Sequence, residues 1–249
     1  MGFGFGLAAL GMIVTGIVML AYVAKMRSNR SEMHHVTEQV GAVVALMLGV
    51  AAFFLQPGIG GALLAVVAIV PSGLFLISLR LSREPDQAPN MVIGQHAPEI
   101  KGVAADGTRF RLSHLRGHPV LLKFYRGFWC QHCLAELKEL ASLAGEFEQL
   151  GVQLVAVSAD DEAETKRFAA KRRFPIQLVS DPDLEGHKAY NVHHRKFTPT
   201  RGPFRELAIP TTVLIGADGK VLWYVQSKDH RVRPHADWVL GMIAPFVQK

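Results

Sequence analysis

Two long stretches without a charged side chain constrain this chain more than any other feature. The first covers residues 2–24, and the second covers residues 40–79, interrupted only by the turn sequence QPGIG at 56–60. About 20 consecutive apolar residues in a helix cross the ~30 Å hydrocarbon core of a bilayer. We therefore predict an N-terminal membrane region over residues 1–80. Its transmembrane helices, about three in number, are expected at 2–24, 40–55 and 59–79.

Two other interpretations of these stretches remain open. Residues 2–24 could be a cleaved signal peptide, but they lack a positively charged start and exceed its usual apolar length of about 7–15 residues. Residues 40–79 could form a buried hairpin in a water-soluble core, although so long a run without charge is more typical of membrane spans. The span at 40–55 is short, and without it the number of crossings falls to two.

The flanking charges predict an orientation. Three crossings place the segment 25–39 and everything after residue 80 on the same side of the membrane. Three cations lie in that segment, and Arg80 and Arg83 follow the last span, whereas the opposite side carries no lysine or arginine. By the positive-inside rule we expect the C-terminal part in the cytoplasm, below a bacterial-type plasma membrane, with the extracytoplasmic side as the alternative.

Nearly all other charged side chains lie after residue 80, where we predict a linker over 81–95 and one globular domain over 96–249. The net charge of +6 includes the clusters KRR at 171–173 and HHRK at 193–196. No recognisable module interleaves these cations with aromatic residues, so we expect no nucleic-acid partner. The cations are more typical of solvated faces, near the lipid bilayer where the domain approaches it.

Strands and helices alternate in the predicted domain. Buried strands are expected at 120–125, 152–159 and 176–180, and two more at 211–225 around the turn Ala217-Asp218-Gly219. Helices are expected at 130–150, 161–173, 184–190 and 235–248, with a long polar loop before Ala208. This order predicts an α/β fold with a central mixed sheet flanked by helices.

Both cysteines lie in the short motif FYRGFWCQHC at 124–133, behind a predicted strand and at the start of a predicted helix. The free backbone N–H groups and the dipole at a helix N-terminus stabilise a thiolate, which we expect at Cys130. Cys133 lies one turn later on the same side. We predict a redox pair in which Cys130 attacks and Cys133 resolves the mixed disulfide.

Other interpretations of the pair stay open at this stage. A structural zinc site would need His193 and His194 as further ligands, although adjacent histidines are poorly spaced for that. The thiols could also be an inert buried pair. His132, between the cysteines, either stabilises the thiolate as a cation or faces solvent without a role. We expect no metal and no cofactor.

A second motif, AIPTTVLIG at 208–216, places Pro210 directly before a predicted strand. Proline cannot donate to a β-ladder, so it marks the start or edge of a strand. Cis peptide bonds are nearly confined to X-Pro, which makes the bond between Ile209 and Pro210 a candidate. From the sequence alone the ordinary trans bond is favoured.

With these motifs in place, residues 94–249 resemble the thioredoxin-fold redoxins, which include AhpC/TSA proteins and membrane-tethered thiol–disulfide oxidoreductases. GQHAPEI, FYRGFWCQHC, AIPTTVLIG and the final helix occur in the family's order. The sequence of the cysteine motif is most similar to that of the peroxiredoxin-like subgroup, which carries FYRGxWCPxC. The resemblance implies a thioredoxin-like fold and a cis Ile209–Pro210 bond that faces the cysteines and lines a substrate groove. Trp129 and Arg126 are expected to tune the thiolate or to line this groove.

Three positions depart from that pattern. Lys123 stands where typical peroxiredoxins have a proline, Gly127 where they have a Thr or Ser hydroxyl, and Gln131 where the subgroup has a proline. Arg126 can supply a cation to a peroxide, but no hydroxyl stands at the family position. A fast peroxidase needs such preorganised donors, whereas disulfide exchange needs mainly an accessible thiolate and a good leaving group.

The sequence therefore favours a membrane-anchored thiol–disulfide oxidoreductase that acts on a thiol or disulfide protein partner. The first alternative is a peroxiredoxin-like hydroperoxide reductase, with antioxidant activity, that uses the same pair. The second is a noncatalytic membrane module whose disulfide is structural or sensing. Loss of turnover on replacing Cys130 with serine would distinguish an enzyme from such a module.

Overall fold

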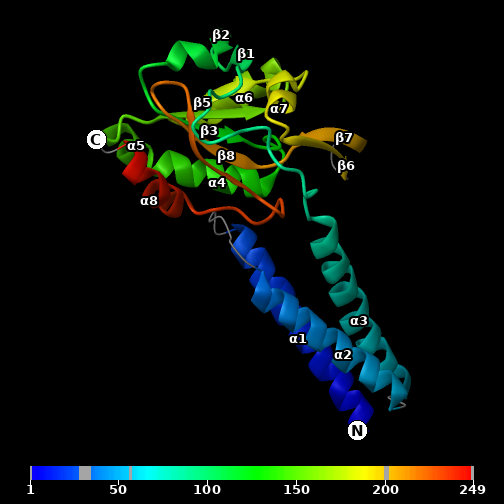
Figure 1. The fold of residues 1–249 in the computed structure, drawn as a ribbon. Helices are drawn as coiled ribbons and strands as arrows, with labels where there is room; N and C mark the ends of the chain where they lie inside the picture. The colour runs from blue at the N-terminus through cyan, green and yellow to red at the C-terminus, as the bar shows by residue number, and fades with distance from the viewer. Residues whose placement is uncertain (1, 28–34, 56–57, 199–201, 248–249) are drawn as a thin grey trace. The chain divides into compact units, whose positions relative to one another are not determined.

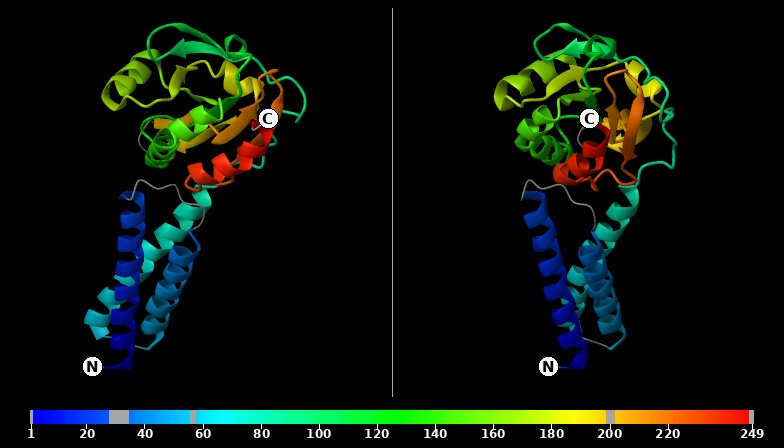
Figure 2. Two further views of the ribbon diagram at one scale, coloured as in Figure 1. Left: turned by 90° about the vertical axis from the view of Figure 1, so that its left-hand side faces the viewer. Right: turned by 60° about the vertical axis from the view of Figure 1, so that its left-hand side comes forward.

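The computed structural model of the protein describes residues 2–27, 35–55, 58–198 and 202–247. The chain divides into two compact units, Met1–Arg83 and Glu84–Lys249 (Figure 1). Figure 2 shows each unit from two further directions: the first consists of long helices and the second is built around a sheet.

Three helices form the N-terminal unit: α1 (Phe3–Arg27), α2 (Val36–Phe54) and α3 (Gly58–Leu81). Each is long and apolar enough to cross a membrane, and α2 begins four residues before the predicted span. Small side chains are buried where the helices meet, namely Ala8, Ala42, Ala45, Ala52, Ala65 and Ala68. Small residues let helix backbones approach closely in lipid. Large apolar side chains such as Leu20 and Ile59 are exposed instead, as expected for surfaces that contact acyl chains.

The C-terminal unit contains a seven-stranded sheet in the order β2-β1-β5-β4-β3-β8-β9. β3 pairs with β4 and β4 with β5 in parallel, and the other neighbours pair antiparallel, so the sheet is mixed as predicted. The strands are β1 (Lys101–Ala104), β2 (Arg109–Arg111), β3 (Val120–Phe124), β4 (Gln153–Ser158), β5 (Gln177–Ser180), β8 (Thr211–Ile215) and β9 (Val221–Gln226).

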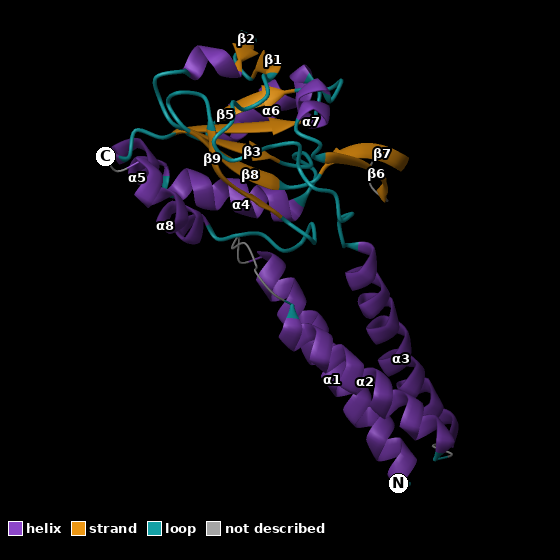
Figure 3. Ribbon diagram, in the orientation of Figure 1, coloured by secondary structure: helices purple, strands orange, loops and turns teal. Residues whose placement is uncertain are grey.

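Helices and loops cover both faces of this sheet. Figure 3 shows α4 (Gln131–Ser142), α5 (Ala144–Gln149) and α8 (Ala236–Val247) along one side of the strands. Their apolar residues, among them Leu137, Phe147 and Ile243, form one buried cluster with the cysteines. The remaining helical elements are the 3₁₀ turn η1 (Leu112–Leu115), α6 (Glu162–Arg172) and α7 (Glu185–Ala189).

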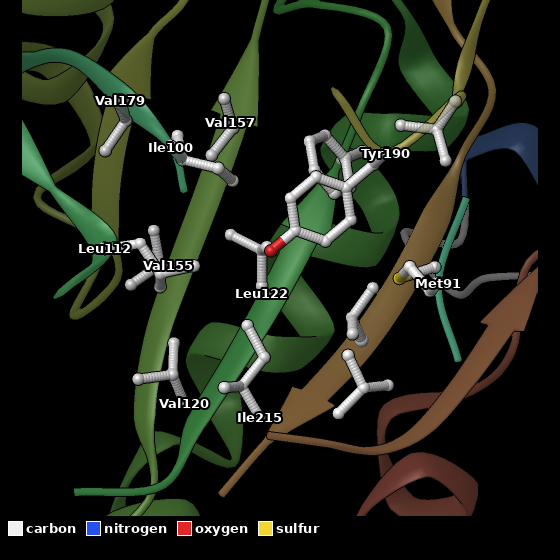
Figure 4. Close-up of a cluster of buried hydrophobic side chains, with 14 of the residues drawn as sticks. Met91, Ile100, Leu112, Val120, Leu122, Val155, Val157, Val179, Tyr190 and Ile215 are labelled. Atoms are coloured by element: carbon white, nitrogen blue, oxygen red, sulfur yellow. The ribbon is translucent and has the colours of Figure 1, made fainter. Parts of the chain in front are cut away.

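A second cluster fills the opposite face of the sheet. Branched side chains of β3 and β4, including Leu122 and Val155, pack there with Ile100 and Tyr190 (Figure 4). The hydroxyl of buried Tyr190 donates to the carbonyl of Pro98 at 2.9 Å, so this large polar side chain has a partner inside the core. β3 is therefore buried on both faces, which explains why its sequence is apolar apart from Lys123.

Three predictions about the elements need correction. The helix expected over 130–150 breaks at Leu143, where the Ser142 hydroxyl bonds back to the carbonyl of Glu139 at 2.7 Å. The loop expected before Ala208 contains the antiparallel pair β6 (His193–Thr198) and β7 (Gly202–Ala208). The sequences HHRKFT and GPFRELA do not alternate regularly between apolar and polar residues, so they give little strand signal. Strands β1 and β2 were not predicted because each has only three or four residues.

The hairpin predicted around Ala217-Asp218-Gly219 is confirmed. β8 and β9 pair antiparallel, and Gly219 has φ +81°, a conformation that glycine adopts without strain. Asp218 accepts a hydrogen bond from the backbone N–H of Lys220 at 3.0 Å, which fixes the turn.

Candidate active site

The two cysteines lie at the N-terminal end of α4. β3 ends at Phe124, and Cys130 is the N-cap residue of α4, with extended backbone angles of φ −89° and ψ 111°. Its carbonyl accepts the first helical hydrogen bond, from the N–H of Leu134 at 3.0 Å. Cys133 follows in the first turn, and both cysteines are free and buried, with 5% and 0% exposed. Their predicted placement behind a strand and at a helix start is confirmed.

Gly127 shapes the turn between β3 and α4. Its φ of +133° is rarely accessible to residues with a Cβ, and an added Cβ would lie 2.5 Å from Trp129 Nε1 and 2.6 Å from Asp160 Oδ1. Asp160, after β4, accepts a hydrogen bond from the N–H of Phe128 at 2.8 Å and so holds the turn in place. A Cβ at position 127 would therefore force Trp129 or Asp160 to move, and no hydroxyl stands at this position.

We expect Gly127→Ala to destabilise the protein by about 2–4 kcal/mol, since it combines backbone strain with overpacking. Guanidinium unfolding followed by tryptophan fluorescence would measure this. Gly117→Ala is the matched control, because Gly117 also has positive φ but an open surrounding. Gly117→Ala should lose only the stability that backbone strain costs. Equal losses of stability in the two variants would contradict the steric argument. Gly127→Thr should likewise lose stability and gain no peroxidase activity.

Arg126 and Trp129 form one wall beside the cysteines. The guanidinium of Arg126 lies 5.1 Å from the centre of the Trp129 ring, a cation–π contact. Arg126 is buried, and its Nε has no hydrogen-bond partner. Both side chains line a cavity of about 200 Å³, together with Ala159, Asp160, Asp161, Glu164, Glu206 and Leu207. The cavity has room for a small side chain; neither cysteine lines it, although Trp129 directly precedes Cys130.

A cluster of buried charges lies beneath Cys133. Lys123 Nζ is 2.5 Å from Glu136 Oε1 and donates to the hydroxyl of Thr212 at 3.1 Å. Arg233, in the loop before α8, places its Nε 3.2 Å from Glu136 Oε2 and its Nη2 3.7 Å from Cys133 Sγ. Burial lowers the pKa of Lys123 and raises that of Glu136, because each charge loses its hydration and their attraction offsets only part of the loss.

A hydrogen bond joins the two thiols, so they share one proton. Burial acts to raise the pKa of both thiols, whereas the charge of Arg233 acts to lower the pKa of both. The buried guanidinium, which contacts Cys133, therefore favours one negative charge on the pair. The expectation that this charge lies at Cys130 stays a prediction.

The cis bond implied for Ile209–Pro210 is wrong, since no peptide bond in the described residues is cis. The trans form is intrinsically favoured for X-Pro bonds, and here it fits the local hydrogen bonds. Ile209 donates from its N–H to Val192, and the carbonyl of Pro210 accepts from Ser227 at 2.9 Å. Thr211 pairs with Phe124 across β3 and β8, so Pro210 lies beside the segment that leads to Cys130. Its role in a substrate groove stays a prediction.

The histidines lie apart from any metal-like arrangement. His132 is half-buried, with its ring centre 6.5 Å from that of His230. His194, considered above as a zinc ligand, lies on β6 with its Nε2 2.5 Å from Glu84. In the described part of the chain, no group of three or more His, Cys, Asp or Glu side chains could hold a metal ion.

Sequence reasoning missed three residues of this site: Asp160, Glu136 and Arg233. Glu136 had a signal, because it follows Cys133 by three residues and shares the buried helix face with Leu137 and Leu140. A lysine within the apolar strand VLLKF was a second signal, since a buried cation needs a partner. Arg233 gave none, because a loop arginine next to a proline is usually solvated.

Curated relatives agree with the redox pair. ResA of Bacillus cereus, a thiol-disulfide oxidoreductase, is 30% identical over 135 residues, which is 53% of this chain and 68% of that protein. ResA of Bacillus subtilis is 30% identical over 130 residues, which is 52% of this chain and 64% of that protein. Both relatives are named thiol-disulfide oxidoreductases, so the matched part of this chain is an oxidoreductase domain.

Solved structures confirm the thioredoxin-like fold. The peroxidoxin BcpB of Mycobacterium tuberculosis is 26% identical, with a TM-score of 0.53 over 64% of this chain and 97% of its own. Peroxiredoxin Q of Xanthomonas campestris is 25% identical, with a TM-score of 0.53 over 63% of this chain and 99% of its own. The AhpC/TSA family pattern matches residues 93–224. With the motif order and the cysteine geometry, these similarities show that the chain belongs to the AhpC/TSA family.

Proposed function

We propose that this protein is a membrane-anchored thiol–disulfide oxidoreductase whose Cys130–Cys133 pair exchanges with thiols or disulfides of partner proteins. The observation that carries the proposal is two free thiols one helical turn apart, above a buried guanidinium that supports a thiolate. The ResA relatives have the same class of activity in their names. This common class makes a noncatalytic module the weaker hypothesis.

The two cysteines have different roles in this proposal. Cys130, at the N-cap and slightly exposed, attacks a substrate disulfide. Cys133, fully buried one turn further along α4, then attacks the mixed disulfide and releases the second substrate thiol. Trp129 and Arg126 border the space beside the pair where a substrate segment would enter, and we expect Ile209 and Pro210 to line the same groove.

A peroxidase acting through the same pair is the second candidate. It is favoured by the similarity to BcpB and by Arg126, whose buried Nε could donate to an oxygen of a peroxide. Gly127 opposes it, because neither the backbone nor the available space allows a hydroxyl-bearing residue there. The chain thus offers one of the donors that a peroxide site needs.

For the membrane region we propose three crossings, a linker over 81–95 and a domain over 96–249 in the cytoplasm. The cations that flank the first and last spans support this side. In a reducing compartment the pair would rest as a dithiol and act as a reductant. Protease added to sealed inverted vesicles should then degrade the domain, and degradation in intact spheroplasts instead would contradict the orientation.

The substrate class can be tested with the full-length protein in detergent micelles. The reduced protein is mixed rapidly with an oxidised protein disulfide or with hydrogen peroxide, while Trp129 fluorescence is followed. We expect the reduced protein to react with the disulfide faster than a free thiolate does. We expect it to react with hydrogen peroxide no faster than a free thiolate does. The double variant Cys130→Ser/Cys133→Ser is the blank. A peroxide rate orders of magnitude above that of a free thiolate would establish the peroxidase and reject the proposal.

A further inference from the structure

The last helix, α8, is apolar on both of its long sides. Its inner side, which includes Val239 and Ile243, is buried in the cluster that also holds the cysteines. Its outer side carries Trp238, Met242 and Phe246, which are 38%, 40% and 44% exposed. These three residues are spaced by four, so they form one stripe along the helix, which we call the outer stripe. A helix that is apolar all round is normally covered on every side, so the outer stripe indicates a contact surface.

The outer side of α8 offers few polar groups to a partner. Asp237, in the first turn, is the one charged residue in the sequence of α8, and the other exposed residues on this side are Gly241 and Pro245. The ring centre of Trp238 lies 5.9 Å from that of Trp223, so the aromatic surface continues onto β9. Protein interfaces usually have a polar rim, whereas tryptophan and phenylalanine on an apolar helix face are typical of the membrane–water interface.

The chain enters the C-terminal unit beside the loop that leads into α8. α3 ends at Leu81, and two residues separate it from Glu84. The backbone N–H of Glu84 donates to the carbonyl of Lys228 at 2.8 Å, and its carboxylate lies 3.6 Å from His230 Nδ1. Both partners belong to the loop between β9 and α8, and α8 begins at Ala236. Three residues of chain span at most about 10 Å, so the chain's connectivity alone keeps this loop near the end of the last span.

We propose that the outer stripe of α8, Trp238, Met242 and Phe246, docks into the surface of the bilayer that the protein's own helices cross. The ligand is the headgroup and upper acyl region of the lipid. Docking orients the redox pair relative to the membrane, because α8 packs on α4, where the N–H of Ala236 donates to Glu139 at 3.4 Å. The inference depends on the membrane spans but not on the chemistry of the cysteines.

The expected attraction is hydrophobic rather than electrostatic. Apolar side-chain area leaves water when the stripe enters the lipid, while α8 has no cation to offer to an anionic headgroup and carries only the acidic Asp237. The covalent connection to the spans keeps the effective concentration of the lipid surface high, so a small apolar area is sufficient. Docking should therefore occur on zwitterionic lipid and persist at about 1 M salt, where charges are screened within about 3 Å.

The test uses the full-length protein reconstituted in phosphatidylcholine vesicles whose acyl chains are brominated near the headgroup end. Bromine quenches the fluorescence of a tryptophan that it contacts. The variant Trp129→Phe/Trp223→Phe keeps Trp238 as its single tryptophan, and Trp223→Phe/Trp238→Phe keeps Trp129. Relative to vesicles without bromine, the emission of Trp238 should fall about twofold or more, because an interfacial helix lies at the depth of the bromine. The emission of Trp129 should hardly change.

A pair of double variants in the single-Trp238 background separates the stripe from general apolar exposure. Met242→Ser/Phe246→Ser removes the rest of the stripe and should reduce the quenching by about half or more. Val92→Ser/Ile93→Ser is the matched control, since these side chains are 56% and 61% exposed but adjoin Met91, which packs on the opposite face of the sheet. The control should leave the quenching unchanged.

Lack of quenching of Trp238 in protein that floats with the vesicles would overturn the inference. Equal quenching of Trp129, equal losses in the two double variants, or loss of quenching at high salt would overturn it as well. If a second copy of the chain covers the stripe instead, Trp238 stays unquenched and becomes accessible to aqueous iodide only when the protein-to-lipid ratio is lowered. Protein that does not float rejects the membrane spans together with the docking. If a serine variant does not fold, the comparison of Trp238 with Trp129 still decides.

Discussion

Replacing Cys130 with serine should abolish turnover with disulfide substrates. A hydroxyl does not ionise near neutral pH, and the thiolate is the nucleophile in exchange. Cys133 cannot take over the attack, because it is fully buried behind the N-cap of α4. The measurement is the steady-state rate at which the full-length protein reduces an oxidised protein substrate. Residual turnover well above the blank would mean that Cys133, or no cysteine at all, starts the reaction.

Replacing Cys133 should stop the reaction one step later. With Cys133→Ser, Cys130 can still attack, but nothing resolves the mixed disulfide, so the substrate stays covalently attached. Electrophoresis without reductant should show an adduct that disappears when a small thiol is added.

These two variants also separate an enzyme from a noncatalytic module. A structural or sensing disulfide would give the same phenotype on loss of either cysteine, namely altered stability or altered partner binding. The proposed mechanism instead predicts different chemical outcomes, no adduct for Cys130→Ser and a stable adduct for Cys133→Ser. Equal adduct formation by both variants would contradict the assigned roles.

The sequence could predict the placement of the redox pair because the relevant interactions are local. A strand buried on both faces, a glycine turn and a helix with regularly spaced leucines lie within a short stretch of chain, so Cys130 had to lie near a helix N-terminus. The apolar helices were visible for the same reason, since length and hydropathy belong to each helix alone.

The buried cation next to the pair could not be predicted from that stretch. Helix N-terminal effects favour a thiolate at Cys130, and a guanidinium from a distant loop adds a second stabilising charge next to Cys133. Only the tertiary fold brings Arg233 to Cys133, and nothing in the sequence RVRP marks this arginine as buried. The bond between Ile209 and Pro210 is a second case. The resemblance implied a cis bond, but the bond is trans at the start of β8.

The buried charge cluster should also dominate the stability of the domain. Glu136→Ala leaves Lys123 and Arg233 as buried cations without their shared carboxylate. Breaking a buried ion pair by removing one partner typically costs about 3–5 kcal/mol. All three tryptophans, Trp129, Trp223 and Trp238, lie in the C-terminal unit, so guanidinium unfolding followed by fluorescence reports on this unit in the full-length protein.

Glu139→Ala is the matched control for this experiment. It lies on the same helix and is half-buried, with one carboxylate oxygen 3.8 Å from His235 Nδ1 and the other accepting from the N–H of Ala236 at 3.4 Å. His235 is 38% exposed, so the loss should be smaller than for Glu136→Ala, which leaves fully buried cations. Lys123→Met combined with Glu136→Gln should cost less than the sum of the two single variants, because the double change removes both partners of one pair. Additive losses, or equal effects of Glu136→Ala and Glu139→Ala, would show that Lys123, Glu136 and Arg233 do not act as one charge-balanced unit.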